Sequence, residues 1–226
     1  MVFVQDPVPS DYRAAVTPVP TALDHLVYAT PSLEATLDAI EATFGVRPLT
    51  GGTHPAWGTR NALLPLGPAT YLELIGPDPG RRPSTRPVIF GLASLTSPRL
   101  VTWAAKGTQL GILVAKALTR GIRLGLPTPG TRQQPDGTIL SWELTDPLQV
   151  TEDGLMPFFI DWGASPHPAA AIAAVVALTD FHAEHPDHQA VRSRLQTLGL
   201  DLRVDPGPLA RLVATFRTPR GLVTLR

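Results

Sequence analysis

Three amphipathic segments, each ended by a glycine at nearly equal spacing, most strongly limit how this chain can fold. The glycines are Gly45, Gly121 and Gly199, which lie 76 and 78 residues apart (121 − 45 and 199 − 121). A glycine directly after an amphipathic stretch is a common helix end, because it adopts the left-handed conformation without steric cost. The spacing therefore predicts a repeated unit with one helix in each copy.

The segments around each predicted helix also recur in order. An apolar strand is expected before it, a short strand after it, and then a hairpin-like pair, which gives a βαβββ unit. The alternative is the ordinary alternation of helices and strands in an α+β protein. The first strands are expected at 23–30, 100–105 and 171–178, and the short strands at 46–48, 122–124 and 200–204.

The repeat predicts four parts of the chain. Residues 1–21 form an N-terminal extension, and residues 22–98 form the first module with a linker. Residues 99–169 form the second module and residues 170–226 a βαβββ-like third module. The proline-rich stretches 77–98 and 164–169 are interpreted as linkers, because proline and glycine interrupt regular structure.

Composition excludes several classes of function. The chain has 226 residues, is 43% hydrophobic, and carries 19 basic and 19 acidic side chains. This balance favours neither nucleic acid nor an anionic membrane as a partner. Cysteine is absent, so thiol chemistry and disulfides are not available. Without a recognisable signal peptide or spanning segment, the expected location is the cytoplasm.

Two polar residues interrupt otherwise apolar strand-like segments. His25 lies in the run 23–28 and Glu73 in the run 70–75. Because a buried carboxylate is costly unless it is paired or bound to a metal, these two side chains are candidate catalytic residues. They could hold a metal, or act as a base with its orienting group. The alternative for His25 is a satisfied core histidine.

Short motifs around these residues resemble a known family. They are the stretches 23–27, 58–61 and 71–74 in the first module, and 132–137 and 157–162 in the second. Together they resemble the vicinal oxygen chelate superfamily, which includes glyoxalases, bleomycin-resistance proteins and extradiol dioxygenases, and within it the glyoxalase-like domain branch. The resemblance covers roughly residues 22–170. It implies an α+β fold in which paired βαβββ modules form an open, cup-shaped mixed barrel with helices outside.

The resemblance also implies a metal site on the floor of the cup. Metal-dependent members take four ligands from the first and last strands of two modules. Here the first module supplies His25 and Glu73, whereas the second offers only Asp161. A three-ligand site, a site completed by His167, and no metal all remain open. Such a ligand set suits a divalent ion, Mg²⁺, Mn²⁺, Fe²⁺ or Zn²⁺.

Five further residues are candidate substrate contacts: Trp57, Arg60, Asn61, Arg132 and Trp142. Aromatic faces, guanidinium groups and amides suit a small anionic or carbonyl ligand. Only one of Arg60 and Asn61 can face the cup, and Arg60 is the expected anion contact, with Asn61 tied to the glycine-rich loop. An Arg132–Asp136 ion pair is the alternative for Arg132. Trp142 is either pocket wall or core.

The histidines at 182, 185 and 188 are interpreted as the solvated start of the third helix rather than as a metal site, because a third convergent ligand is lacking.

Two functions fit these expectations. The first is a metal-assisted lyase, isomerase or dioxygenase that acts on a small molecule. The second is a non-catalytic binding or sequestering protein of the bleomycin-resistance type, with a cup lined by Trp57, Trp103 and Trp142. Because modules normally pair, the third module is expected to pair with its copy in a homodimer. The alternative is that it covers a sheet edge within one chain.

Overall fold

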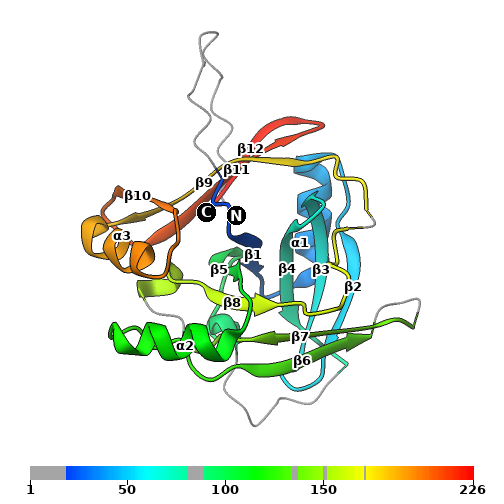
Figure 1. Cartoon of the computed structure of the whole chain (residues 1–226). Coiled ribbons are helices and arrows are strands. Elements are labelled where there is room, and N and C mark those ends of the chain that lie inside the picture. Colours follow the sequence, from blue (N-terminus) through cyan, green and yellow to red (C-terminus); the bar gives the residue numbers. More distant parts are fainter. Residues whose placement is uncertain (1–18, 81–88, 134–136, 150–151, 171) are drawn as a thin grey trace.

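The computed structural model describes residues 19–80, 89–133, 137–149, 152–170 and 172–226. Most of the predicted N-terminal extension therefore lies outside the described residues. The described part contains three successive βαβββ units, as the repeat predicted (Figure 1). The left-handed glycines Gly45, Gly121 and Gly199 follow the three helices of these units. No helix in the described ranges is long and apolar enough to cross a membrane.

The first two units share one sheet. The first contains β1 (Leu23–Ala29), α1 (Leu33–Phe44), β2 (Leu49–His54), β3 (Thr59–Gly67) and β4 (Thr70–Pro77). The second contains β5 (Arg99–Lys106), α2 (Leu110–Thr119), β6 (Thr128–Gln133), β7 (Ile139–Leu144) and β8 (Phe158–Asp161). Short 3₁₀ turns lie at Ile89–Gly91 and Glu152–Gly154.

The eight strands follow the order β2-β3-β4-β1-β5-β8-β7-β6. In each of these two units the first strand pairs in parallel with the last strand. Antiparallel pairing of β1 with β5 joins the two units. The outer strands β2 and β6 come into contact, so the sheet curls into a nearly closed barrel. The predicted cup-shaped α+β fold is therefore confirmed.

The two faces of this sheet pack against different partners. Side chains on the outer face, such as Leu26 and Leu72, join the helices in the main core. Side chains on the inner face, such as Val27 and Ile75, form a second apolar cluster inside the barrel. Trp103 belongs to the outer core and donates its indole N–H to the Leu155 carbonyl. The expectation that Trp103 lines the cup is therefore wrong.

The third unit has its own sheet with a different topology. It contains β9 (Ala177–His185), α3 (His188–Thr197), β10 (Arg203–Pro206), β11 (Arg211–Thr218) and β12 (Gly221–Leu225). Its order is β10-β9-β11-β12, so its first strand pairs in parallel with the strand after the helix rather than with the last strand.

One face of the third sheet packs on the outside of the barrel. Phe181 contacts Trp103 of β5 with ring centroids 5.7 Å apart, and Phe216 contacts Phe44 of α1 at 5.4 Å. The apolar face of the third unit is therefore used within the chain, and it covers a sheet face rather than a sheet edge. The homodimer stays a prediction.

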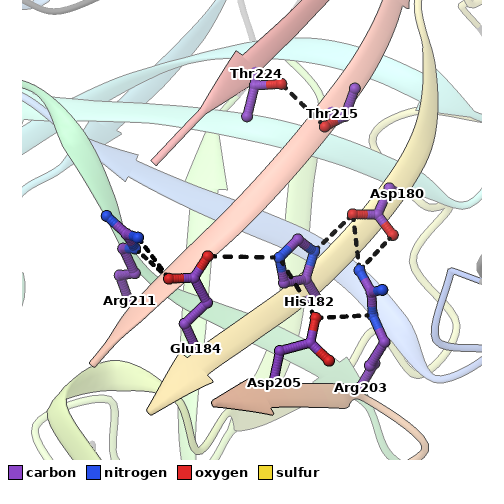
Figure 2. Close-up of polar contacts among 8 residues, drawn as sticks. All are labelled: Asp180, His182, Glu184, Arg203, Asp205, Arg211, Thr215 and Thr224. Atoms are coloured by element: carbon purple, nitrogen blue, oxygen red, sulfur yellow. Dashed lines mark hydrogen bonds and ion pairs between the residues drawn. The ribbon is translucent and has the colours of Figure 1, made fainter. Parts of the chain in front are cut away.

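The other face of the third sheet is charged. It carries six side chains that contact one another, which we call the third-unit charged cluster (Figure 2). The members are Asp180, His182, Glu184, Arg203, Asp205 and Arg211.

Several strand positions differ from the sequence expectation. The first strand of the third unit is 177–185 rather than 171–178, so His182 and His185 lie in a strand and only His188 begins the helix. Buried Phe181 and Ala183 alternate with polar neighbours there, which is the pattern of a half-buried strand. The segment 122–124 forms no strand, because Ile122 and Leu124 are buried in the main core as a connection.

Candidate functional site

His25 and Glu73 meet on the inner face of the barrel. In the parallel pairing of β1 with β4, His25 lies opposite Tyr71, and Val27 lies opposite Glu73. Strand alternation therefore turns both polar side chains to the same side. His25 Nε2 lies 3.9 Å from Glu73 Oε2, and the two residues are 3% and 8% exposed.

Aromatic rings hold His25 in place. Its imidazole stacks on Tyr71 at a centroid distance of 4.6 Å, and its edge meets Phe158 at 5.6 Å. Burial raises the pKa of Tyr71 well above its usual value, and the nearby charges of Asp24 and Glu73 raise it further. Tyr71 is therefore a neutral stacking partner for the imidazole.

Asp24 lies next to His25 and binds it from the other side. Its Oδ1 is 2.8 Å from His25 Nδ1, and the residue is 1% exposed. Burial by itself would raise the pKa of Asp24, but hydrogen bonds and charges from His167 and His25 outweigh it and hold this pKa well below its usual range. The carboxylate is therefore ionised.

The ionised Asp24 determines which nitrogen of His25 carries the proton. A carboxylate can only accept a hydrogen bond, so His25 Nδ1 carries the proton. In neutral His25 the unprotonated Nε2 then faces Glu73 Oε2, which is also an acceptor. Two acceptors that converge at 3.9 Å favour a proton, a polarised donor or a cation between them.

Asn61 and Arg132 extend this cluster. The Asn61 amide nitrogen donates to Glu73 Oε1 at 2.6 Å, and its oxygen accepts from Gly52 N at 2.8 Å and from Arg132 Nη1 at 3.3 Å. A Cβ at Gly51 would lie only 2.1 Å from Asn61 Oδ1, so this position leaves no space for a side chain. Asp24, His25, Asn61, Glu73 and Arg132 are called the inner polar cluster below.

Arg132 brings a buried cation to the cluster. It lies on β6, where that strand approaches β2, and it is 6% exposed. Its Nε is buried and finds no hydrogen-bond partner among the described residues. The alternative partner Asp136 lies outside the described residues. A buried guanidinium with an unused donor suits an anionic group of a ligand.

His54 is a neighbour that the sequence interpretation missed, because it lies in a segment read as a glycine-rich loop. The structure places it at the end of β2, with Nδ1 3.0 Å from the Thr59 hydroxyl. Burial lowers the pKa of His54, Glu73 acts in the opposite direction, and Arg132 lowers it further. The pKa of His54 therefore depends on both Glu73 and Arg132.

The remaining predicted contacts divide into two groups. Trp57 and Trp142 pack against the inner apolar cluster, and Trp142 also meets Trp162 at 5.3 Å. Asn61 is tied to the glycine-rich loop through Gly52 N, as expected, but the inward face of β3 carries Asn61 rather than Arg60. Asn61 faces inward, whereas Arg60 forms an ion pair with Glu34 of α1 because it alternates with Asn61 along β3. Arg60 therefore does not join the cluster.

Among its described residues, the second module contributes no ligands comparable to His25 and Glu73. The inner face of β5 and β8 carries Thr102, Ala104, Phe158 and Ile160, and Val101 also packs against the inner apolar cluster. Asp161 alternates with Ile160, and its carboxylate accepts from Gly163 N at 2.9 Å. Within the described ranges, no group of three or more His, Cys, Asp or Glu side chains could hold a metal ion.

Comparison with known proteins agrees with this architecture. A crystal structure of a hypothetical protein from Staphylococcus aureus is 14% identical, with a TM-score of 0.64, and the match covers 84% of this chain and 87% of that one. This likeness concerns the fold.

Two methylmalonyl-CoA epimerases match less well. A variant of the Streptomyces coelicolor enzyme, in complex with 2-nitronate-propionyl-CoA, is 22% identical with a TM-score of 0.46, covering 66% of this chain and all of that one. The Mycobacterium tuberculosis enzyme is 18% identical with a TM-score of 0.42, covering 70% and 95%.

No curated protein matches the sequence. The family model described as "Glyoxalase-like domain" matches residues 23–199, which include the whole barrel and extend into the third unit. The chain therefore belongs to the glyoxalase-like domain family.

Proposed function

We propose that the inner face of the barrel binds a small carboxylate-bearing molecule, and that His25 and Glu73 move a proton on it, as in an isomerase or lyase. The observation that carries this proposal is the approach of His25 Nε2 to Glu73 Oε2 at 3.9 Å within a buried, largely apolar surface. A base must lie within reach of the proton it removes, and both atoms face one point.

The chemistry follows from the acceptor pair. A carbon acid next to a carbonyl can give a proton to one acceptor, which leaves an enolate. If the acceptor trades that proton with water before a proton returns to the same carbon, the result is an exchange. Return of the proton to a neighbouring atom is an isomerisation, and neither outcome needs a reactant other than water. Asp24 holds the imidazole from behind, and Asn61 holds the Glu73 carboxylate.

Arg132 supports a carboxylate as the anchoring group of the ligand. Its buried Nε has no partner in the described ranges, and its Nη1 makes only a 3.3 Å contact with Asn61. A planar guanidinium matches a carboxylate in shape and charge. Trp57 and Trp142 supply apolar surface for the rest of the ligand.

A divalent metal fits this donor set only in part. His25 Nε2 and Glu73 Oε2 are two suitable donors, but the inner positions of β5 and β8 add no histidine or carboxylate. Protein sites for catalytic metals usually supply three ligands or more. We therefore assign no step to a metal. Metal analysis of protein purified without chelator tests this part of the interpretation.

A second candidate function is binding without chemistry. One observation favours it: Asn61 already links Glu73 Oε1 to Arg132 Nη1 through hydrogen bonds. Such a linked set can recognise a ligand by charge and hydrogen bonding without moving a proton. The two candidates share the ligand class and differ only in proton transfer.

Pyruvate is a suitable first probe, because it is a small 2-oxo acid with exchangeable methyl protons. Proton NMR in D₂O follows loss of the methyl signal and, by line broadening, binding. Catalysed exchange that disappears in His25→Ala and Glu73→Gln supports the enzyme, with Glu184→Gln as the matched control. Binding without exchange supports the second candidate. If pyruvate shows neither binding nor exchange, the result counts against both candidates.

A further inference from the structure

Asp24 receives N–H groups on both of its carboxylate oxygens. Oδ1 is 2.8 Å from His25 Nδ1, while Oδ2 lies 3.2 Å from Trp162 Nε1 and 3.5 Å from His167 Nε2. Trp162 and His167 follow β8, so the end of the second module reaches the first strand of the first module. Neither Asp24 nor Trp162 stood among the sequence-predicted site residues.

The two groups beside Oδ2 can only donate. An indole N–H has no acceptor capacity. His167 Nδ1 accepts a hydrogen bond from Ala169 N at 3.2 Å, so its ring proton lies on Nε2, the nitrogen that faces Asp24. This buried Nε2 has no other partner in the described part of the chain. A side chain at position 24 must therefore present an oxygen atom to these two donors.

We infer that Asp24 is the positioning residue of the site, which fixes His25 with its proton on Nδ1, and that Trp162 and His167 lock Asp24 in that role. Its functional meaning rests on the proposed function, whereas the tautomer itself can be measured without any substrate. Asp24 contacts His25 behind the reacting face, so it acts through the imidazole.

Asp24→Asn tests the inference sharply, because an amide has one oxygen and one NH₂ group. The donors of Trp162 and His167 favour the amide oxygen on their side. The NH₂ group then faces His25 Nδ1, which must accept, and the imidazole proton moves to Nε2. An asparagine in place of a triad aspartate is known to produce the wrong histidine tautomer in this way.

The experiment is long-range ¹H–¹⁵N correlation NMR on protein labelled at the histidine rings, with His25 assigned by its loss in His25→Ala. The expected wild-type result at neutral pH is a protonated Nδ1 on His25. The expected result for Asp24→Asn is transfer of that proton to Nε2. The control is Asp161→Asn, which should leave His25 unchanged. Among the described residues, the Asp161 carboxylate accepts a hydrogen bond only from Gly163 N.

His167→Phe provides a second variant that keeps an aromatic ring beside Tyr71 and Trp162. Alone it leaves the His25 proton on Nδ1; combined with Asp24→Asn it weakens the preference for Nε2, because one of the two locking donors is gone. A wild-type His25 whose neutral ring carries the proton on Nε2 overturns the inference, even if Asp24→Asn fails to fold. An Asp24→Asn protein that folds and keeps Nδ1 protonated overturns it too.

The proposed function can fail separately. If the tautomer moves as expected but pyruvate shows neither binding nor exchange, Asp24 still positions His25, and only the proposed function is lost.

Discussion

Two histidines in this molecule have nearly the same surroundings on different sheets. His25 lies between Asp24 at 2.8 Å and Glu73 at 3.9 Å, inside the barrel. His182 lies between Asp180 at 2.6 Å and Glu184 at 3.9 Å, on the third sheet (Figure 2). Each belongs to the first strand of its unit.

The two sites differ in how their carboxylates are balanced. In the third-unit charged cluster, Arg203 pairs with both Asp180 and Asp205, and Arg211 pairs with Glu184, so every acid contacts a guanidinium. In the inner polar cluster, Asp24 receives the neutral indole N–H of Trp162 in addition to His25, and Glu73 receives the Asn61 amide. Its cation, Arg132, reaches Glu73 only through Asn61.

Burial increases this difference. The side chain of Asp205, near His182, is 38% exposed, whereas that of Asp24 is 1% exposed. Exposed ion pairs are screened and contribute little, while buried charges depend fully on their partners. A His–carboxylate arrangement by itself is therefore weak evidence for a site. Burial, neutral donors and an unused cation distinguish the barrel site from the third-unit cluster.

The largest expected difference concerns stability. Asp24→Ala removes the acceptor of buried N–H groups, and we expect it to lower the free energy of unfolding by about 3–5 kcal/mol. Asp180→Ala, in the partly exposed cluster, should cost only about 1 kcal/mol after screening by solvent. Urea denaturation of both variants measures the difference. Equal losses would show that the two sites are energetically alike.

The next effect concerns function. Glu73→Gln keeps an oxygen for the Asn61 amide but replaces the acceptor that faces His25 with a donor. If exchange of pyruvate protons is detected, we expect its rate to fall about 100-fold or more, the scale of a lost general base. The matched change Glu184→Gln should leave the rate unchanged. A loss in Glu184→Gln would move the active centre to the third unit.

The free energy of unfolding at low pH should also depend on Asp24. Its folded-state pKa is depressed, because hydrogen bonds and charges from His167 and His25 outweigh the effect of burial. Its contribution to stability is therefore present above about pH 4 and is lost as the pH falls from there toward the folded pKa. This one group accounts for a slope of at most about 1.4 kcal/mol per pH unit. Asp24→Asn should flatten that limb of the stability curve, and Asp161→Asn should not.

The smallest effect is that of salt on the third-unit charged cluster. Arg203→Gln and Arg211→Gln should each cost less than about 1 kcal/mol at low salt, because both side chains are more than a third exposed, and less still in 1 M NaCl. Thermal denaturation at two salt concentrations checks this. A loss of several kcal/mol that salt does not reduce would mean that these ion pairs are as critical as the buried groups.

Much of the fold could be predicted from sequence periodicity, because helix ends and strand alternation are local properties. Gly45, Gly121 and Gly199 revealed the three units, and alternation correctly suggested that His25 and Glu73 avoid the main core. The faces of Arg60 and Asn61 were assigned the wrong way round, because a shift of one residue along a strand exchanges its two faces. The pairing of β3 with β4, which puts Asn61 opposite Ile75 of the inner face, fixes the register.

Other features depend on contacts between distant parts of the chain. Asp24 precedes His25 where the β1–β5 pairing is irregular, so strand alternation does not indicate that it also binds Trp162, which lies 138 residues away. The sequence predicted the first strand of the third unit at 171–178 rather than at 177–185, because the polar residues of its charged face resemble a helix start. Pairing with β11 and β10 gives those residues their place in a sheet.

A titration with malonate, a small dicarboxylate, tests the central claim most directly. NMR of the labelled histidine rings reports the six histidines together, including both histidines of the comparison. Because Arg132 belongs to the inner polar cluster and lowers the pKa of His54, we predict that malonate shifts the signals of His25 and His54 and leaves His182 unchanged. Arg132→Gln should abolish the response. A response at His182 that persists in Arg132→Gln, with His25 unaffected, would contradict the account.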